Sequence, residues 1–195
     1  MTALYRRAAA AFGPEVPGLV GFLLLVLVVF GVAAPNFLTG ANFGSIAFQL
    51  PELGLLTLAM LMPIISGGFN LAIIYTANMA GLTLAFVLNQ YGGVEAGIWP
   101  FLLGTVLAIG VGALSGAVMG AVIAYIGAHP ILVSLAMMIF LRGLGEFLTK
   151  GGDISGFPEW MAVLGHGTAW GVPVPLILFL LCAVLWHIIL NRTRH

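Results

Sequence analysis

Long uncharged stretches separate the few charged residues of this chain. No charged residue lies between Glu15 and Glu52, between Glu52 and Glu95, or between Glu95 and Arg142. Hydrocarbon expels charge at roughly 2.5 to 3.5 kcal/mol for an Asp, Lys or Arg at a helix centre, and about 20 apolar residues cross a bilayer. Each gap is long enough for a membrane-spanning helix, so the pattern predicts an integral membrane protein.

Helices of about 20 residues placed on the apolar runs give about six membrane spans. The predicted spans are 18–34, 43–64, 70–90, 98–126, 131–148 and 174–190. The fold class is therefore all-α and polytopic, with a single transmembrane domain over 1–195. The longest connection, 149–173, holds Lys150, Asp153 and Glu159 among Gly, Ser and Pro residues and is predicted to be an outer loop.

The first apolar run follows Arg6 and Arg7 and ends in Val32-Ala33-Ala34, which imitates a signal peptide with a cleavage site. Its length and the spans that follow favour a signal-anchor helix instead. The same two arginines, with Arg192 and Arg194 after the last span, predict that both termini lie in the cytoplasm.

Composition and charge exclude several function classes. Only 6% of the residues are charged, against about a quarter in globular domains, and the formal net charge is zero. A nucleic-acid footprint is therefore not expected. Cys182, the single cysteine, is read as a small packing residue. No metal site is expected either, because the histidines lie near different span ends without ligand spacing; they are His129, His166, His187 and His195.

A ladder of small residues runs along the fourth predicted span. Its members, each four apart and so on one helix face, are Ala108, Gly112, Gly116, Gly120 and Ala124. Such a stripe lets another helix backbone approach closely, which is the main attraction between helices in lipid. The stripe is either ordinary packing within the chain or an interface with another subunit.

The paired glycines Gly67 and Gly68 interrupt an apolar stretch, and the amides Asn70 and Asn78 follow them. A helix broken at membrane depth can line a wet cavity, where freed amides bind a polar solute. The alternative is a turn between two spans, with Asn70 as the helix N-cap. Spacing alone does not decide between them.

The stretch from Pro51 through Gly67-Gly68-Phe69-Asn70-Leu71 resembles the Gly-Gly-Ile-Asp-Leu-Ser-Val-Gly signature of ribose-type sugar permeases. These are membrane subunits of ATP-binding-cassette importers. Further segments that resemble the family occur in the same order: Pro35-Asn36-Phe37-Leu38-Thr39 with Asn42, His129 to Met138, Leu141 to Leu144, Gly151 to Pro158, and Gly171 to Pro175.

Two departures from the family pattern limit what can be carried over. The family's Asp is Asn70 here, and its Ser-Val-Gly is replaced by Ala72-Ile73-Ile74, so a role of that carboxylate does not transfer. The sequence also stops where the family continues into a cytoplasmic loop that docks on the ATPase. The chain thus resembles the N-terminal part of a type II importer permease, as a truncated product or one part of a split subunit.

The resemblance implies a bacterial inner-membrane importer. A periplasmic solute-binding protein would deliver the solute, a second permease chain would complete the path, and ATP would be bound by partner ATPase subunits. This chain is expected to bind no cofactor and to catalyse no reaction. Lys150 is its only lysine and lies in the predicted outer loop, so a Gly-Lys-Ser/Thr phosphate loop is absent from the sequence.

Polar residues inside the spans are the candidate lining of the solute path. They are Gln49, Glu52, Asn70, Tyr75, Thr76 and Asn78. Arg142 and Glu146 are four apart on the fifth span, so they are predicted to pair. This pair is read as structural, with docking of the binding protein as the alternative.

The leading hypothesis is a permease subunit that moves a small polar solute, in particular a monosaccharide. The alternatives are a fragment that only packs with a partner, and a secondary transporter. The last is disfavoured because the sequence has no visible internal repeat.

Overall fold

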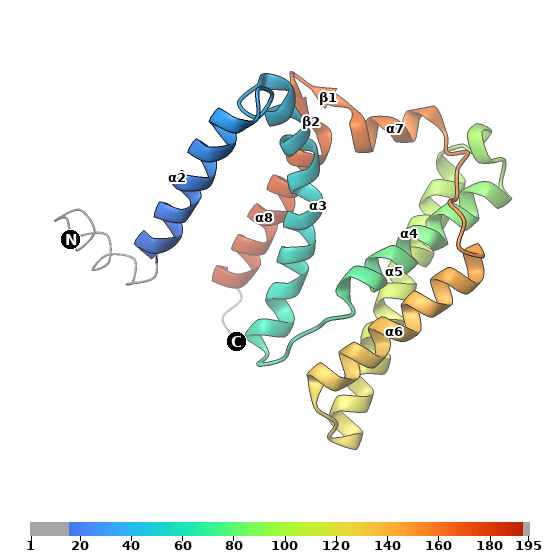
Figure 1. Cartoon of the computed structure of the whole chain (residues 1–195). Helices are drawn as coiled ribbons and strands as arrows, with labels where there is room; N and C mark the ends of the chain where they lie inside the picture. The colour runs from blue at the N-terminus through green and yellow to red at the C-terminus, as the bar shows by residue number, and fades with distance from the viewer. Residues whose placement is uncertain (1–15, 193–195) are drawn as a thin grey trace. The chain divides into compact units, whose positions relative to one another are not determined.

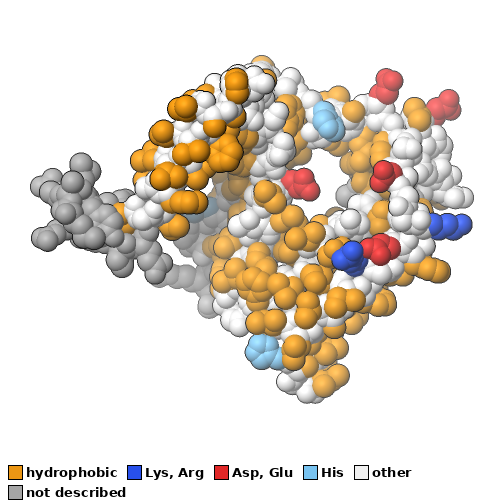
Figure 2. Space-filling model, in the orientation of Figure 1, with side chains coloured by type: hydrophobic (Ala, Val, Ile, Leu, Met, Phe, Trp, Pro, Cys, Tyr) orange, Lys and Arg blue, Asp and Glu red, His pale blue; other side chains and the backbone are white. Residues whose placement is uncertain are grey.

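The protein is described by a computed structural model that covers residues 16–192 (Figure 1). Arg6, Arg7, Arg194 and His195, on which parts of the orientation and metal arguments rest, lie outside the described residues. Tertiary contacts divide the chain between Ala47 and Phe48 into two units, which we describe separately. On the face shown in Figure 2 apolar side chains are spread over the described part of the chain, with few charged groups among them.

The first unit holds helix α2 (Val16–Ala33) and the start of α3 (Gly40–Ile65). The turn between them is fixed by side chains: Asn42 Nδ2 donates to the carbonyl of Phe37 at 2.7 Å, and Thr39 Oγ1 accepts from the backbone N–H of Asn42 at 3.4 Å. The second contact is the usual one of an N-cap residue. The unit boundary falls at Ala47, whose carbonyl has no intrahelical donor because Pro51 lacks an N–H.

The best-packed part of the second unit is formed by three helices, α4 (Ile73–Gln90), α5 (Ile98–Ala121) and α6 (Pro130–Thr149). α4 packs most closely on α5 and also lies against α6. Gly104 of α5 faces Leu84, and Gly112 faces Thr76, so these two helices are antiparallel. α6 follows α5 after a tight turn and runs back along it, so α6 is parallel to α4.

α5 ends in a π-helical turn, η2 (Val122–Ile126). Gly127 then takes a left-handed conformation with φ of 73°, which glycine adopts without steric penalty, and α6 begins with Pro130 at its first position. Together α5 and η2 occupy residues 98–126.

The predicted outer loop contains regular structure. It holds a short helix, α7 (Glu159–His166), and a hairpin of β1 (Thr168–Ala169) and β2 (Val172–Pro173), after which α8 (Val174–Arg192) begins. A 3-10 turn, η1 (Gly93–Glu95), joins α4 to α5. The hairpin was not predicted because its turn is Trp170-Gly171, with φ of 53° and 78° at the two residues. Such turns usually carry Asn-Gly or Asp-Gly.

Helices occupy all six predicted spans, and their ends lie within three residues of the predicted ones. Two starts differ by three residues: the second span begins at 40 instead of 43, and the third begins at 73 instead of 70 because residues 66–72 are not helical. Five helical segments are long and apolar enough to cross a membrane: α2, α3, α5 with η2, α6 and α8. α4 has the length, but its Thr, Asn, Gln and Tyr side chains make it more polar, and α5 and α6 cover it.

Candidate solute path

A polar cavity of about 380 Å³ lies between α4, α6 and the segment that follows α6. Tyr75 and Asn78 line it from α4, Arg142 and Glu146 line it from α6, and Asp153 lines it from the following segment. The apolar side chains in the wall include Leu82, Leu141 and Ile154. Charged groups within a candidate span are costly in lipid and are usually found facing a water-filled cavity, so this is the first candidate for a solute path.

Arg142 and Glu146 form an ion pair in this cavity. Arg142 Nε donates to Glu146 Oε1 at 2.9 Å, as the spacing of four residues predicts. The two side chains are 61% and 62% exposed. The phenol of Tyr75 also interacts with the Arg142 guanidinium. The pair is therefore turned towards the open cavity rather than buried between helices.

A second cavity, of about 370 Å³, lies between α3 and α4. Glu52 lines it from α3, and Asn78 lines it from α4 together with Ile74 and Ala77. Asn78 is thus shared by both cavities. The structure brings Glu52, Tyr75 and Asn78 to one region, although they are up to 26 positions apart in the sequence.

Thr76 points to a different side of α4. It lines a mostly apolar cavity between α3, α4 and α5, and its hydroxyl oxygen is buried without a hydrogen-bond partner in the described part of the chain. Gln49 is exposed on α3 and lines none of the cavities described here.

The break at Gly67 and Gly68 lies beside the end of α5 and the start of α6. Gly67 has φ of 76°, and the backbone amide of Gly68 donates to the carbonyl of Pro63 at 2.8 Å. A cavity of about 480 Å³ there is lined by Gly67 to Asn70, Gly116, Gly120, Pro130 and Ser134, among others. The non-helical segment therefore packs alongside other helices instead of projecting beyond them.

Two side-chain hydrogen bonds hold this segment. Asn70 Oδ1 accepts from the backbone amide of Ala72 at 3.0 Å, which is an Asx turn just before α4; the N-cap position is Ala72, so the alternative of Asn70 as N-cap does not hold. Ser134 Oγ, which is 3% exposed, lies 3.1 Å from the carbonyl oxygens of both Phe69 and Ile131, so its single hydroxyl hydrogen is shared between the break and α6 itself.

The ladder of small residues is divided between two surroundings. Ala108 and Gly112 lie towards α4, but the residues of α5 that are buried are Gly104, Ser115 and Met119. Gly116 and Gly120 face the cavity beside the glycine break, and a Cβ at either would meet nothing within 4 Å. Ala124 is exposed in the π-helical turn. The stripe in contact with α4 is thus shifted towards Gly104, since α4 begins only at residue 73 and leaves the last turns of the antiparallel α5 uncovered.

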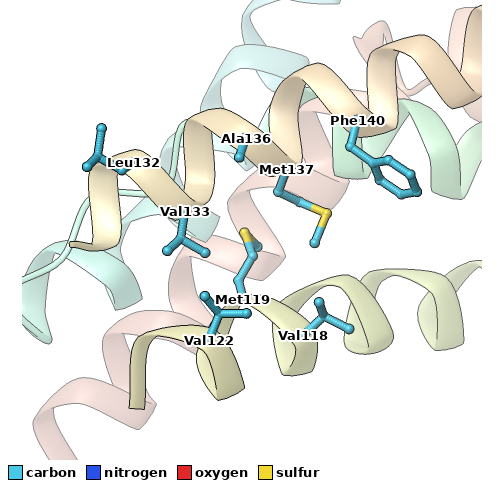
Figure 3. A pocket seen from close by; sticks show the side chains of 8 residues that line it. All are labelled: Val118, Met119, Val122, Leu132, Val133, Ala136, Met137 and Phe140. Atoms are coloured by element: carbon cyan, nitrogen blue, oxygen red, sulfur yellow. The ribbon is translucent and has the colours of Figure 1, made fainter. Parts of the chain in front are cut away.

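The uncovered turns of α5 form an apolar groove with α6 (Figure 3). It is lined by Val118, Met119, Val122, Leu132, Val133, Ala136, Met137 and Phe140. Its lining offers no group to hydrogen-bond a polar solute, so it does not belong to the candidate path.

Sequence reasoning missed two residues of these sites. Asp153 lines the polar cavity, but its position in a loop gave no sign of that. Ser134 could have been noticed as a polar residue inside an apolar helix.

Comparison with known proteins supports the resemblance that the sequence carries. The model of a family described as "Branched-chain amino acid transport system / permease component" matches residues 42–195. Two relatives are the Autoinducer 2 import system permease proteins LsrD of Yersinia pestis (strain Pestoides F) and Yersinia pseudotuberculosis serotype O:3 (strain YPIII). Each is 28% identical over 200 residues.

The match covers 98% of this chain and 56% of each relative, so the chain spans little more than half the length of these relatives. No solved structure matches it. The chain belongs to the family of branched-chain amino acid transport system permease components.

Proposed function

We propose that this chain is a membrane subunit of an ATP-driven, binding-protein-dependent importer that moves a small neutral polar solute, in particular a monosaccharide, across the bacterial cytoplasmic membrane. The supporting observation is the polar cavity between α4 and α6, which gathers Tyr75, Asn78, Arg142, Glu146 and Asp153 in a chain that is otherwise apolar. Family membership supports the transport role, and the relatives named above are import permeases by name.

The side chains suit a solute that must be released as well as admitted. Asn78 offers an amide donor and a carbonyl acceptor, and Tyr75 offers a hydroxyl that can do both. Such neutral groups exchange hydrogen bonds with water and solute at modest net free energy, about 0.5 to 1.5 kcal/mol each. A row of weak contacts lets a solute pass without being trapped.

The proposal includes partners that supply what this chain lacks. ATPase subunits would bind and hydrolyse ATP, a periplasmic solute-binding protein would deliver the solute, and a second permease chain would face this one. Both termini would lie in the cytoplasm, as Arg192 in the last turn of α8 favours.

Asn78→Leu in the complete importer tests the function. It removes the polar group shared by both cavities with little change in volume, and we expect uptake to fall about tenfold, the effect of losing about 1.4 kcal/mol of interaction. Uptake of radiolabelled D-ribose, D-xylose, D-glucose and D-galactose into proteoliposomes that contain the permease chains, the ATPase and the binding protein is the measurement.

Phe86→Leu on the same helix is the control, because Phe86 is exposed and lines neither polar cavity. It should transport like the wild type. Normal uptake by Asn78→Leu in a normally assembled complex would remove Asn78 from the path. A wild-type complex that hydrolyses ATP but takes up none of these sugars would refute the proposed solute class.

A further inference from the structure

The Arg142–Glu146 pair lies within one helix, where an ion pair does not hold neighbouring helices together. Both residues belong to α6, four positions apart, so their contact cannot hold one helix to another. Both side chains are more than half exposed, and both line the polar cavity. An intrahelical pair in such a place stabilises only its own helix, and α6 is already fixed by its buried residues Ser134, Leu141 and Gly145.

The pair also has unused hydrogen-bonding capacity. The contact recorded for this part of the chain uses Arg142 Nε and Glu146 Oε1. An arginine has four further N–H donors on its two Nη atoms, and a carboxylate has a second acceptor oxygen. A hydroxyl both accepts and donates, so neighbouring hydroxyls of one solute can accept from the guanidinium and donate to the carboxylate.

The charges around the cavity select among solutes. Its lining carries one cation, Arg142, and two carboxylates, Glu146 and Asp153. Glu52 adds a third carboxylate in the neighbouring cavity that shares Asn78. Like charges at close range repel strongly where the dielectric is low. An anionic solute is therefore disfavoured, whereas a neutral polyol meets donors and acceptors without that penalty.

We propose that Arg142 and Glu146 are specificity-determining residues of the solute path, which together bind neighbouring hydroxyls of a neutral polyol as it passes between α4 and α6. This inference rests on the proposed importer function and assigns the pair a role in the path instead of in the stability of α6. Tyr75 lines the same cavity from α4, opposite the pair on α6.

Exchanging Arg142 and Glu146 distinguishes a structural role of the pair from a role in binding solute. The double variant Arg142→Glu with Glu146→Arg keeps an ion pair at the same spacing, and an acidic residue that precedes a basic one by four positions is the more favourable order in a helix. A structural pair predicts that the exchanged protein folds, assembles and transports normally. A pair that binds solute predicts a fall in uptake, because donor and acceptor have changed places in the cavity.

The measurement is initial uptake in proteoliposomes of whichever sugar of the panel above the wild type transports, with competition by the corresponding sugar acid. For the exchanged variant we expect uptake to fall about tenfold or more, as for the loss of a hydrogen bond to a charged group. Co-purification with the ATPase should persist. Wild-type uptake should be inhibited by excess neutral sugar and hardly at all by the sugar acid.

Lys150→Asn is the matched control. Lys150 follows α6 directly and has a left-handed conformation with φ of 53°, which Asn tolerates, and it does not line the cavity. This variant loses a charge at the same helix end and should transport normally. Wild-type uptake by the exchanged variant, or equal competition by the sugar acid, would overturn the inference. Failure of the wild type to take up any neutral sugar would instead refute the proposed function itself.

Discussion

At the scale of single residues, Thr76 differs from the other described helical threonines whose side-chain contacts are recorded. Thr57, Thr83, Thr105 and Thr149 each donate to the carbonyl four positions earlier. The Thr76 hydroxyl is buried and has no partner among the described residues. A buried polar group without a partner costs about 1 to 3 kcal/mol, so Thr76 lowers stability at a place where the proposed path runs nearby.

Thr76→Val should therefore stabilise the protein, since valine keeps the shape and removes the unpaired hydroxyl. We expect a higher apparent unfolding temperature in detergent, measured by circular dichroism. Thr83→Val is the control, because Thr83 Oγ1 donates to Met79 at 2.8 Å, so its loss should bring no gain. Equal shifts for the two variants would contradict this account of Thr76.

Asn70 was predicted to line the solute path, but its side chain makes a hydrogen bond within the turn before α4. Its Oδ1 accepts from the backbone amide of Ala72 in the Asx turn, which fixes the direction of the side-chain amide. The sequence shows that an amide follows the glycines, but only the course of the backbone shows that its oxygen accepts from the N–H of Ala72.

At the scale of helices and loops, α4 and α5 approach each other closely where α5 carries a glycine that has no room for a side chain. A Cβ at Gly104 would lie 2.6 Å from Leu84 Cδ1 and 3.3 Å from Val87 Cβ, whereas a Cβ at Gly116 would meet nothing within 4 Å. The small residues are therefore equally spaced in the sequence but lie in two different environments in the structure.

Gly104→Leu should destabilise the protein by about 1 to 3 kcal/mol, because a larger side chain would force α4 and α5 apart. Gly116→Leu should leave stability unchanged or slightly raised, since leucine favours helix over glycine by somewhat less than about 1 kcal/mol. Thermal unfolding of both variants in one detergent is the measurement. The opposite order of stabilities would show that α5 contacts α4 along the ladder after all.

One tryptophan connects α7 to the start of α5. Trp160 Nε1 donates to the carbonyl of Ala96 at 3.2 Å, and its ring meets Phe101 edge to face at 5.2 Å between centroids. The sequence does not predict this aromatic contact, because its two rings are far apart along the chain.

Trp160→Phe keeps a ring but leaves the buried Ala96 without its donor, and we expect the docking of α7 to weaken by about 1 kcal/mol. Hydrogen exchange in the backbone of residues 159–166 should become faster. Trp170→Phe is the control, because Trp170 is 99% exposed and its loss should not change this exchange. Unchanged exchange in Trp160→Phe would mean that other contacts hold α7.

At the scale of the whole molecule, the main question is whether α4 crosses the membrane. It is more polar than the five apolar segments, but it runs antiparallel to α5, an apolar candidate span, and is covered by α5 and α6. A polar helix that packs against apolar ones keeps part of its polar surface away from lipid, and Asn78, which is exposed, faces the cavities described above. We expect α4 to be a sixth span.

Cysteine labelling tests this topology. In a Cys182→Ser background, Ser66→Cys before α4 should react with a membrane-impermeant maleimide only after the inner face is exposed. Tyr91→Cys after α4 and Trp170→Cys in the hairpin should react from the outer face. Ser66, Tyr91 and Trp170 are all exposed, which makes them suitable sites. Reaction of Ser66→Cys and Tyr91→Cys from the same side would contradict a crossing by α4.

The sequence by itself determined the membrane class, the helical fold, the places of the six helices to within three residues, and the family. These follow from local information: charge is excluded from hydrocarbon, and runs of apolar residues set the helix lengths. It also placed an ion pair at residues four apart on one helix, because that contact depends on helix geometry alone.

Only the tertiary structure decided which polar groups meet. Glu52, Asn78 and Arg142 come from three helices, and Asp153 comes from a segment without regular structure. Their grouping depends on the packing of α6 against α4, on the direction of α4 and on the place of the non-helical residues 66–72 beside other helices. These are packing outcomes among residues far apart in the chain, and helical periodicity does not encode them.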